Sequence, residues 1–201
     1  MTAAVHLVLL RHGQTNWNAE GRMQGQCDIP LNDIGFAQAE AAAPAVAALA
    51  PSQIIASDLK RAAGTAQIAA GHLNLPVSHD QRLREVCYGQ WEGRTRSEIG
   101  EDVLAAVHRD PTLHRGVDGE TMIEAADRTA AGLTDAAASV APGQTVLVVA
   151  HGTVARVGTL RLLGVDPSLW ESVRTMDNCH WLVLERRAET WRLVSYNLGV
   201  A

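Results

Sequence analysis

Two histidine–glycine pairs, His12–Gly13 and His151–Gly152, stand just after apolar segments of the chain. Val5–Leu10 and Thr145–Ala150 are apolar enough to be strands buried on both faces of a sheet. Ligands of open α/β sheets bind at the carboxyl ends of the strands, so both imidazoles are expected over one crevice. Glycine after each histidine lets the backbone come close to a bound anion, and the N–H groups of both glycines are expected to face it.

Two arginines add positive charge to the same crevice. Arg11 follows the first strand, and Arg61 lies in the first turn of a helix for which Asp58 is the expected N-cap. A positive side chain in that turn is unfavourable with the helix dipole, which suggests a bound anion. With the two histidines, these arginines form a dense positive cluster in a chain whose net charge is -5. Each residue alone is more often structural, but the joint pattern indicates a phosphate site, because arginine holds phosphate through paired charge-assisted hydrogen bonds.

Several other chemistries are excluded because the chain lacks their motifs. Lys60 is the single lysine and stands between Leu59 and Arg61, so there is no Walker A P-loop. The chain has no Gly-x-Gly fingerprint, no cysteine phosphatase loop, no Asp-x-Asp pair and no His-Glu-x-x-His zinc motif. The three cysteines form neither a Cys-x-x-Cys pair nor a disulfide framework. We therefore expect no metal and no cofactor.

The charge balance and the apolar pattern limit the partners and the location. A mildly acidic chain is unsuited to general binding of nucleic acid or of an anionic membrane. No apolar run approaches the ~18 residues of a spanning helix, and Met1–Leu10 shows no signal-peptide pattern, so a cytoplasmic protein is expected. The expected partner is a small phosphate monoester, and a homodimer is compatible with the sequence.

The elements that must position the cluster alternate between strands and helices. Gln53–Ala56 is expected to be another buried strand, whereas His180–Glu185 and Trp191–Tyr196 alternate more and fit a late antiparallel pair. The expected helices are Asp33–Leu49, Leu59–Leu73, Thr95–His108, Glu120–Val140 and Thr153–Leu163. This alternation predicts an α/β fold: a three-layer α/β/α sandwich with a mostly parallel sheet, helices on both faces and an antiparallel edge strand.

The length of 201 residues fits a single domain, 1–201. Leu75–Gly93 is the least regular stretch of the first half, and Asp110–Gly119 is a loop that contains proline and glycine. A small cap-like insertion around 86–119 is therefore expected.

The segment Leu10–Asn18, which reads Leu-Arg-His-Gly-Gln-Thr-Asn-Trp-Asn, resembles the signature of the histidine phosphatase superfamily in its phosphoglycerate mutase-like branch. The resemblance continues, in the family's order, through Arg22–Leu31, Ser57–Ala62, Leu83–Glu85, Gly89–Gly93 and Ala150–Gly152. It implies a histidine phosphatase domain that hydrolyses phosphate monoesters.

The resemblance assigns roles to the residues of the cluster. His12 is the implied nucleophile, which forms a phosphohistidine; a neutral imidazole can attack without a separate base. Arg11, Arg61 and His151 are implied to hold the negative charge of the transferring group. Glu85 is the implied acid that protonates the leaving oxygen and then activates water. Burial or a dianionic substrate nearby would favour the protonated carboxyl that this role requires.

Further residues are implied to bind the substrate. The neutral amides of Asn18 and Gln24 match positions that contact the phosphoryl group, and amides can donate hydrogen bonds to its oxygens. Gly25 and Gly152 belong to the same expected binding set. Glu92 is part of another pattern of the family and is expected to be structural.

The leading functional prediction is hydrolysis of a small phosphorylated metabolite, a sugar phosphate or a phosphoglycerate ester. Gln24–Gln26 and Met176–Trp181 are similar to segments of actinobacterial glucosyl-3-phosphoglycerate phosphatases, which implies that substrate. The alternatives are a phosphoglycerate mutase with the same phosphohistidine and an inactive scaffold that binds phosphorylated ligands. A mutase needs extra chain between Glu85 and His151 to exclude water, and the 66 positions that separate them are few for such a lid. The complete set of catalytic residues disfavours the scaffold.

Overall fold

One sheet of six strands forms the centre of the protein, whose computed structural model describes residues 3–200. The strands are β1 (Val5–Arg11), β2 (Pro51–Ala56), β3 (Val77–His79), β4 (Thr145–Ala150), β5 (Trp181–Arg187) and β6 (Thr190–Leu198). Their order across the sheet is β3-β2-β4-β1-β5-β6. The first four of this order run parallel, and β5 and β6 pair antiparallel at one edge. The prediction of a mostly parallel sheet with antiparallel strands at an edge is confirmed.

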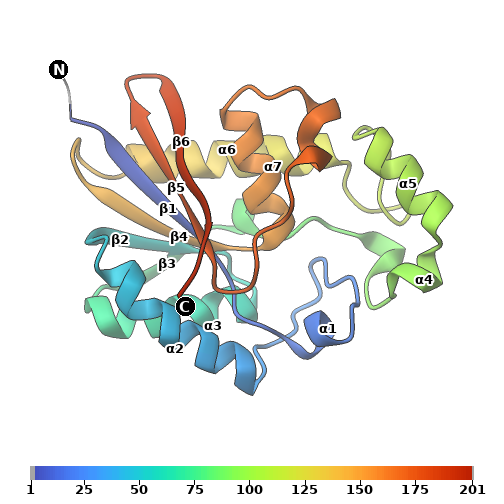
Figure 1. The fold of residues 1–201 in the computed structure, drawn as a ribbon, viewed down its shortest axis with the longest axis horizontal. Helices are drawn as coiled ribbons and strands as arrows, with labels where there is room; N and C mark the ends of the chain where they lie inside the picture. Colours follow the sequence, from blue (N-terminus) through green and yellow to red (C-terminus); the bar gives the residue numbers. More distant parts are fainter. Residues whose placement is uncertain (1–2, 201) are drawn as a thin grey trace.

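Helices cover both faces of this sheet (Figure 1). The helices are α1 (Asn16–Ala19), α2 (Asp33–Ala47), α3 (Lys60–Leu73), α4 (Arg96–Ile99), α5 (Glu101–Arg109), α6 (Met122–Ala138) and α7 (Gly152–Leu162), with 3-10 turns at Gln81–Leu83, Gly89–Trp91 and Pro167–Ser172. The pair α2 and α3 packs on one face, and the pair α6 and α7 packs on the other. Within residues 3–200, no helix combines the length and the apolar character needed to cross a membrane.

The central strand β1 shows why this sheet needs helices on both faces. Leu7 and Leu9 belong to the core on the α6–α7 side, whereas Val8 and Leu10 belong to the core on the α2–α3 side. All four side chains are buried. Each such burial stabilises the fold by about 1.5–3 kcal/mol, so a strand that is apolar at every position favours the three-layer arrangement.

The N-terminus of α3 is capped differently from the prediction. Asp58 is not the N-cap: Leu59 holds that position, and the N–H of Lys60 donates to the carboxylate of Asp28 at 2.7 Å. Asp58 instead accepts two hydrogen bonds from Arg84, at 2.7 and 2.5 Å, and these lower the pKa of its carboxyl. Asp28, which is distant in the chain, therefore caps α3 in place of Asp58, because the carboxylate of Asp58 is held by Arg84.

Two further predictions need correction. The expected helix Thr95–His108 is interrupted at Gly100, whose φ of 101° takes the backbone out of the helical region and separates α4 from α5. Strand β3 lies in the stretch predicted to be irregular, and its three residues are too few to show a periodic pattern. The other predicted strands and helices agree with the structure to within two residues at each end.

The segment that contains α4 and α5 lies at one end of the molecule, near α1 (Figure 1). Its start is tied to the loop after α1 by backbone hydrogen bonds. The N–H of Gly93 donates to Met23 at 2.8 Å, and the N–H of Met23 donates to Arg94 at 2.9 Å. Arg22 and Thr95 form an isolated antiparallel bridge beside them. This segment therefore stands beside the loops that follow β1.

Candidate active site

The pairing of β1 with β4 brings the two histidines together. Arg11 is the register partner of Ala150, so the residues that follow each strand are neighbours. The N–H of His12 donates to the carbonyl of Ala150 at 3.0 Å. The ring centroids of His12 and His151 are 5.1 Å apart, and both side chains are buried. The two imidazoles are therefore neighbours, as expected, and His12 is the one that lines the cavity beside them.

The imidazole of His12 is oriented by the backbone. Its Nδ1 lies 2.6 Å from the carbonyl oxygen of Gly13, which can only accept a hydrogen bond. Nδ1 therefore carries the proton, and the lone pair of Nε2 is available for attack. Burial and the positive Arg61 and Arg11 hold the pKa of His12 well below 6.5, so the ring is neutral. The amide of Asn178 donates to the carbonyl of His12 at 2.9 Å and fixes this turn.

The ring of His151 uses both nitrogens within the protein. Nδ1 accepts a hydrogen bond from Nε of Arg61 at 3.1 Å, so the ring proton lies on Nε2, which donates to the hydroxyl of Ser57 at 2.8 Å. Burial and Arg61 hold the pKa of His151 well below 6.5. A small cavity lies beside His12, and neither His151 nor Gly152 is among the residues that line it. This histidine contacts the guanidinium of Arg61 rather than opening into the cavity.

Arg61 is fully buried and organises the loop after β1. Its two terminal nitrogens donate to the carbonyls of Cys27 at 2.8 Å and Gly25 at 2.7 Å. With the bond to His151, three of its five N–H groups are used, and the remaining two can meet a ligand in the cavity that it lines. The unfavourable interaction of Arg61 with the dipole of α3 is therefore offset by its hydrogen bonds to carbonyl groups of the protein.

Arg11 keeps more of its hydrogen-bonding capacity free. One terminal nitrogen donates to the carbonyl of Met176, and Nε is buried without a partner among residues 3–200. Gly152 makes room for this guanidinium, because a Cβ there would press against Arg11 and Thr175. The N–H of Gly13, expected to face an anion, donates instead to the hydroxyl of Thr65 at 3.1 Å.

The carboxylate of Glu85 is held at the N-terminus of α7. It accepts hydrogen bonds from the backbone N–H groups of Val86 at 2.9 Å and of Thr153 and Val154 at 3.1 Å. A negative group is stabilised at this end of a helix. Glu85 is 9% exposed and lines the same cavity as His12. The predicted acid and the predicted nucleophile therefore share one small space.

Two amide side chains line the cavity from the loop after β1. The amide oxygen of Asn18 accepts from the N–H of Thr15 in a capping box at the start of α1. The amide oxygen of Gln24 accepts from the hydroxyl of Thr15 at 2.9 Å. Because both oxygens are used, the two NH2 groups remain as donors at the cavity.

Gly25 and Glu92 shape this loop. Gly25 has a φ of +53°, and a Cβ there would overlap the carboxylate of Glu92. That carboxylate accepts from the N–H of Gln26 at 2.8 Å, the N–H of Tyr88 at 3.2 Å and the thiol of Cys27 at 3.1 Å. These contacts match the structural role expected for Glu92.

Sequence reasoning missed Arg128, which fixes the backbone beside Glu85. Its guanidinium donates to the carbonyls of Arg82 at 2.8 Å, Arg84 at 2.7 Å and Glu85 at 2.9 Å. It also forms two hydrogen bonds with the carboxylate of Glu120, at 2.6 and 2.7 Å. Arg128 lies on α6, far along the chain from Arg82, Arg84 and Glu85, and no local motif marks it.

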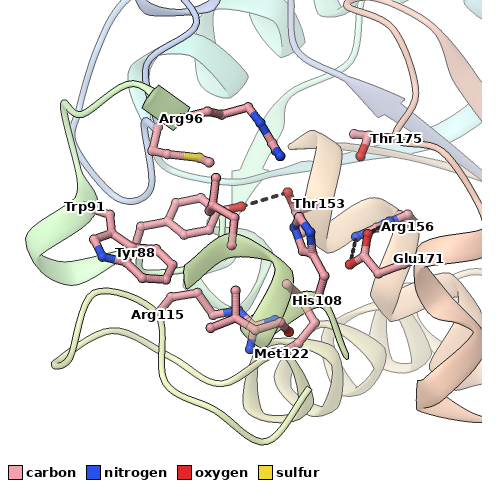
Figure 2. A pocket seen from close by; sticks show the side chains of 13 residues that line it. Tyr88, Trp91, Arg96, His108, Arg115, Met122, Thr153, Arg156, Glu171 and Thr175 are labelled. Carbon is pink, nitrogen blue, oxygen red and sulfur yellow. Dashed lines mark hydrogen bonds and ion pairs between the residues drawn. The ribbon is translucent and has the colours of Figure 1, made fainter. Parts of the chain in front are cut away.

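Two cavities lie side by side at this site and share part of their lining. The smaller measures about 160 Å³ and is lined by Arg11, His12, Asn18, Gln24, Arg61 and Glu85, among others. The larger measures about 280 Å³ and is drawn in Figure 2. Met23, Tyr88 and Thr153 line both. Within residues 3–200, no group of three or more His, Cys, Asp or Glu is placed to hold a metal ion.

The chain matches a protein family and is similar to known proteins. The family model of the histidine phosphatase superfamily (branch 1) matches residues 7–199. A glucosyl-3-phosphoglycerate phosphatase of Mycolicibacterium vanbaalenii is 40% identical over 189 residues, which cover 89% of this chain and 83% of that protein. A probable phosphoglycerate mutase of Cronobacter sakazakii is 35% identical over 190 residues, which cover 93% of this chain and 87% of that protein.

A solved structure is also similar. The structure of mycobacterial glucosyl-3-phosphoglycerate phosphatase with VO3 has a TM-score of 0.91 at 34% identity, over 96% of this chain and 99% of that one. The family model, the relatives and the fold agree with one another. The chain therefore belongs to the histidine phosphatase superfamily (branch 1) and is a phosphatase.

Proposed function

We propose that this phosphatase hydrolyses a small phosphate monoester through a phosphohistidine formed on Nε2 of His12. The observation that carries the proposal is the orientation of the ring: Nδ1 is bonded to the carbonyl of Gly13, which leaves Nε2 unprotonated. The lowered pKa of His12 keeps the ring neutral and nucleophilic. Attack by Nε2 on phosphorus breaks the ester bond, and the alcohol leaves.

In this proposal the transferring phosphoryl group is held by Arg11, Arg61 and the amides of Asn18 and Gln24. These residues line the cavity beside His12, where their remaining N–H groups can stabilise developing negative charge. His151 contributes through Arg61, because its unprotonated Nδ1 accepts from Nε and orients the guanidinium. Gly152 gives space for the guanidinium of Arg11, and Gly25 gives space for the carboxylate of Glu92.

Glu85 supplies the proton in this proposal. Its carboxyl lines the cavity next to His12, so it can protonate the leaving oxygen and then take a proton from the water that attacks the phosphohistidine. Arg128 holds the carbonyl of Glu85 and so keeps its backbone in position.

The proposed substrate is glucosyl-3-phosphoglycerate. The support is the activity for which two similar proteins are named: the relative that is 40% identical, and the mycobacterial phosphatase whose structure has a TM-score of 0.91. A phosphoglycerate mutase is the alternative, favoured by the relative that is 35% identical. The two differ in whether water reaches phosphorylated His12. We expect net phosphate release from phosphoglycerate esters and little 2-/3-phosphoglycerate interconversion, even with a bisphosphorylated primer.

A single-turnover experiment tests the covalent step. Brief incubation with radiolabelled substrate followed by an alkaline quench leaves base-stable, acid-labile label on His12. The His12→Ala variant, shown to be folded by circular dichroism, loses both the label and turnover. Label that persists in this variant would remove His12 as the nucleophile. A phosphate-release screen over phosphorylated metabolites, with glucosyl-3-phosphoglycerate among them, ranks the substrates.

Three other expectations belong to the same proposal. The segment 86–119 serves as a small cap over the substrate, supported by its backbone bonds to the loop after α1. Action in the cytoplasm and assembly as a homodimer stay predictions.

A further inference from the structure

The larger cavity extends away from the phosphate site and has room for the alcohol part of a substrate. Its volume is about 280 Å³, close to the lower end of the range for small-molecule sites. It meets the smaller cavity at Met23, Tyr88 and Thr153, so a phosphate held near His12 would direct its ester oxygen and its alcohol into this space. The hydroxyls of Tyr88 and Thr153 contact each other at 3.1 Å along the boundary (Figure 2).

Positive charge dominates the lining of this cavity. Arg96, Arg115 and Arg156 line it, and Glu171 is the one acidic side chain among its lining residues. His108 stands between them, and its pKa is lowered by burial and by the positive charge of all three arginines, opposed by Glu171. The cavity therefore keeps an excess of positive charge in a chain whose net charge is -5. Such a cavity favours an anionic group.

The three arginines differ in how much of their hydrogen-bonding capacity is free. Arg115 is buried and donates to backbone carbonyls, among them those of Leu113 at 2.6 Å and Val107 at 2.8 Å. Arg156 pairs with both carboxylate oxygens of Glu171, at 2.9 and 2.8 Å. Both use their terminal nitrogens within the protein, and Nε of Arg156 is buried without a partner among residues 3–200.

Arg96 is the one that can turn to a ligand. Its contact within residues 3–200 is one hydrogen bond of 3.3 Å to Glu101, and both side chains of this pair are exposed. An exposed pair of this kind is weak. In Figure 2 the guanidinium of Arg96 reaches over the cavity towards Thr153, on the side where the ring of His108 also lies. A neutral imidazole adds one N–H donor to the guanidinium N–H groups.

We propose that Arg96 and His108 form a carboxylate subsite that selects phosphate monoesters whose alcohol carries a carboxylate. This rests on the proposed phosphatase function and adds the residues that select the leaving group. Arg96 offers two parallel N–H groups that match the two oxygens of a carboxylate, and His108 donates a third hydrogen bond. Arg115 and Arg156 add background positive charge without direct contact.

A matched pair of substrates tests the subsite. In 3-phosphoglycerate and glycerol 3-phosphate the phosphate sits on the same terminal carbon, and the two differ in whether the other end is a carboxylate or an alcohol. Wild type prefers 3-phosphoglycerate. Arg96→Met lowers kcat/KM for 3-phosphoglycerate by about 10- to 100-fold, the value of hydrogen bonds to a charged group. Its kcat/KM for glycerol 3-phosphate stays within about twofold, as for a surface substitution.

Two further variants separate the subsite from general charge effects. Arg109→Met removes a positive charge from α5 at a residue that donates to the carbonyl of Ala105 and does not line the cavity. It leaves the preference of wild type unchanged. His108→Leu removes one neutral donor and lowers kcat/KM for 3-phosphoglycerate by about 3- to 10-fold.

The outcomes distinguish this proposal from the function on which it rests. Equal kcat/KM of wild type on the two substrates, or an equal loss on both in Arg96→Met, overturns the subsite while phosphatase activity stands. A preference that falls as much in Arg109→Met as in Arg96→Met also overturns it. A wild-type protein that releases no phosphate from either substrate or from p-nitrophenyl phosphate overturns the proposed function itself.

Discussion

Replacing Glu85 with glutamine tests the proposed acid, and the structure shows that this change is not neutral for stability. One carboxylate oxygen accepts from Val86 and Val154, and the other accepts from Thr153. Glutamine has one acceptor oxygen and one NH2 group, so in Glu85→Gln a donor must face a backbone N–H. The variant also removes a negative charge from the N-terminus of α7.

The expected loss of stability follows from these contacts. A hydrogen bond to a charged group contributes about 1.5–3 kcal/mol, and a partly buried charge at a helix terminus contributes up to about 2 kcal/mol. The two effects overlap, because the same N–H groups carry the helix charge. We therefore expect the free energy of unfolding to fall by about 2–4 kcal/mol in Glu85→Gln, measured by urea denaturation.

The effect on catalysis depends on the leaving group. An alkyl phosphate needs its leaving oxygen protonated, whereas an aryl phosphate leaves with little help. In rapid-quench measurements of the phosphorylation rate, Glu85→Gln should lose about 10²- to 10⁴-fold on an alkyl phosphate and far less on an aryl phosphate. Glu92→Gln is the control, since its oxygens serve Gln26, Tyr88 and Cys27. It should lower stability without any dependence on the leaving group.

Equal losses on alkyl and aryl phosphates would refute the assignment of Glu85 as the acid. Glu92 would then be the next carboxylate to test. It is poorly suited to the role, because it does not line the cavity that His12 and Glu85 share.

The remaining predictions concern pH, a positioning residue and metal. Because the pKa of His12 and of His151 is held well below 6.5, the unfolded chain binds more protons than the folded one as pH falls below about 6.5. The free energy of unfolding should therefore decrease from pH 6.5 downwards, by up to about 2.7 kcal/mol per pH unit, and urea titrations in which stability rises there would contradict this. Arg128→Met should lower kcat more on alkyl than on aryl phosphates by displacing Glu85, and Arg128→Lys should recover part of the loss; a uniform loss on both would leave Arg128 a purely structural role. Activity should survive exhaustive EDTA treatment and be inhibited by vanadate, whereas recovery of an EDTA-inactivated enzyme by Mg²⁺ or Zn²⁺ would show a metal requirement.

The layered sheet and the meeting of the two histidines could be predicted from local sequence. The segments before His12 and His151 are apolar at successive positions, and such strands are stable only with helices on both faces. Parallel strands place their carboxyl ends at one edge, so residues that follow them must meet. These conclusions need only the order of residues along short segments. The family resemblance then supplied the roles of Glu85, Asn18 and Gln24.

Only the tertiary structure decided which groups form hydrogen bonds with the residues of the site. Arg61 donates hydrogen bonds to Gly25, Cys27 and His151, each of which is more than thirty positions away in the chain. Asp28, rather than Asp58, accepts from the first N–H of α3. Such contacts depend on how loops pack over the finished sheet, and short-range patterns carry no information about distances across it. The charge balance of the larger cavity also depends on the tertiary structure. Arg96 and Glu171 come from separate parts of the chain and line one cavity only when the sheet and its helices are assembled.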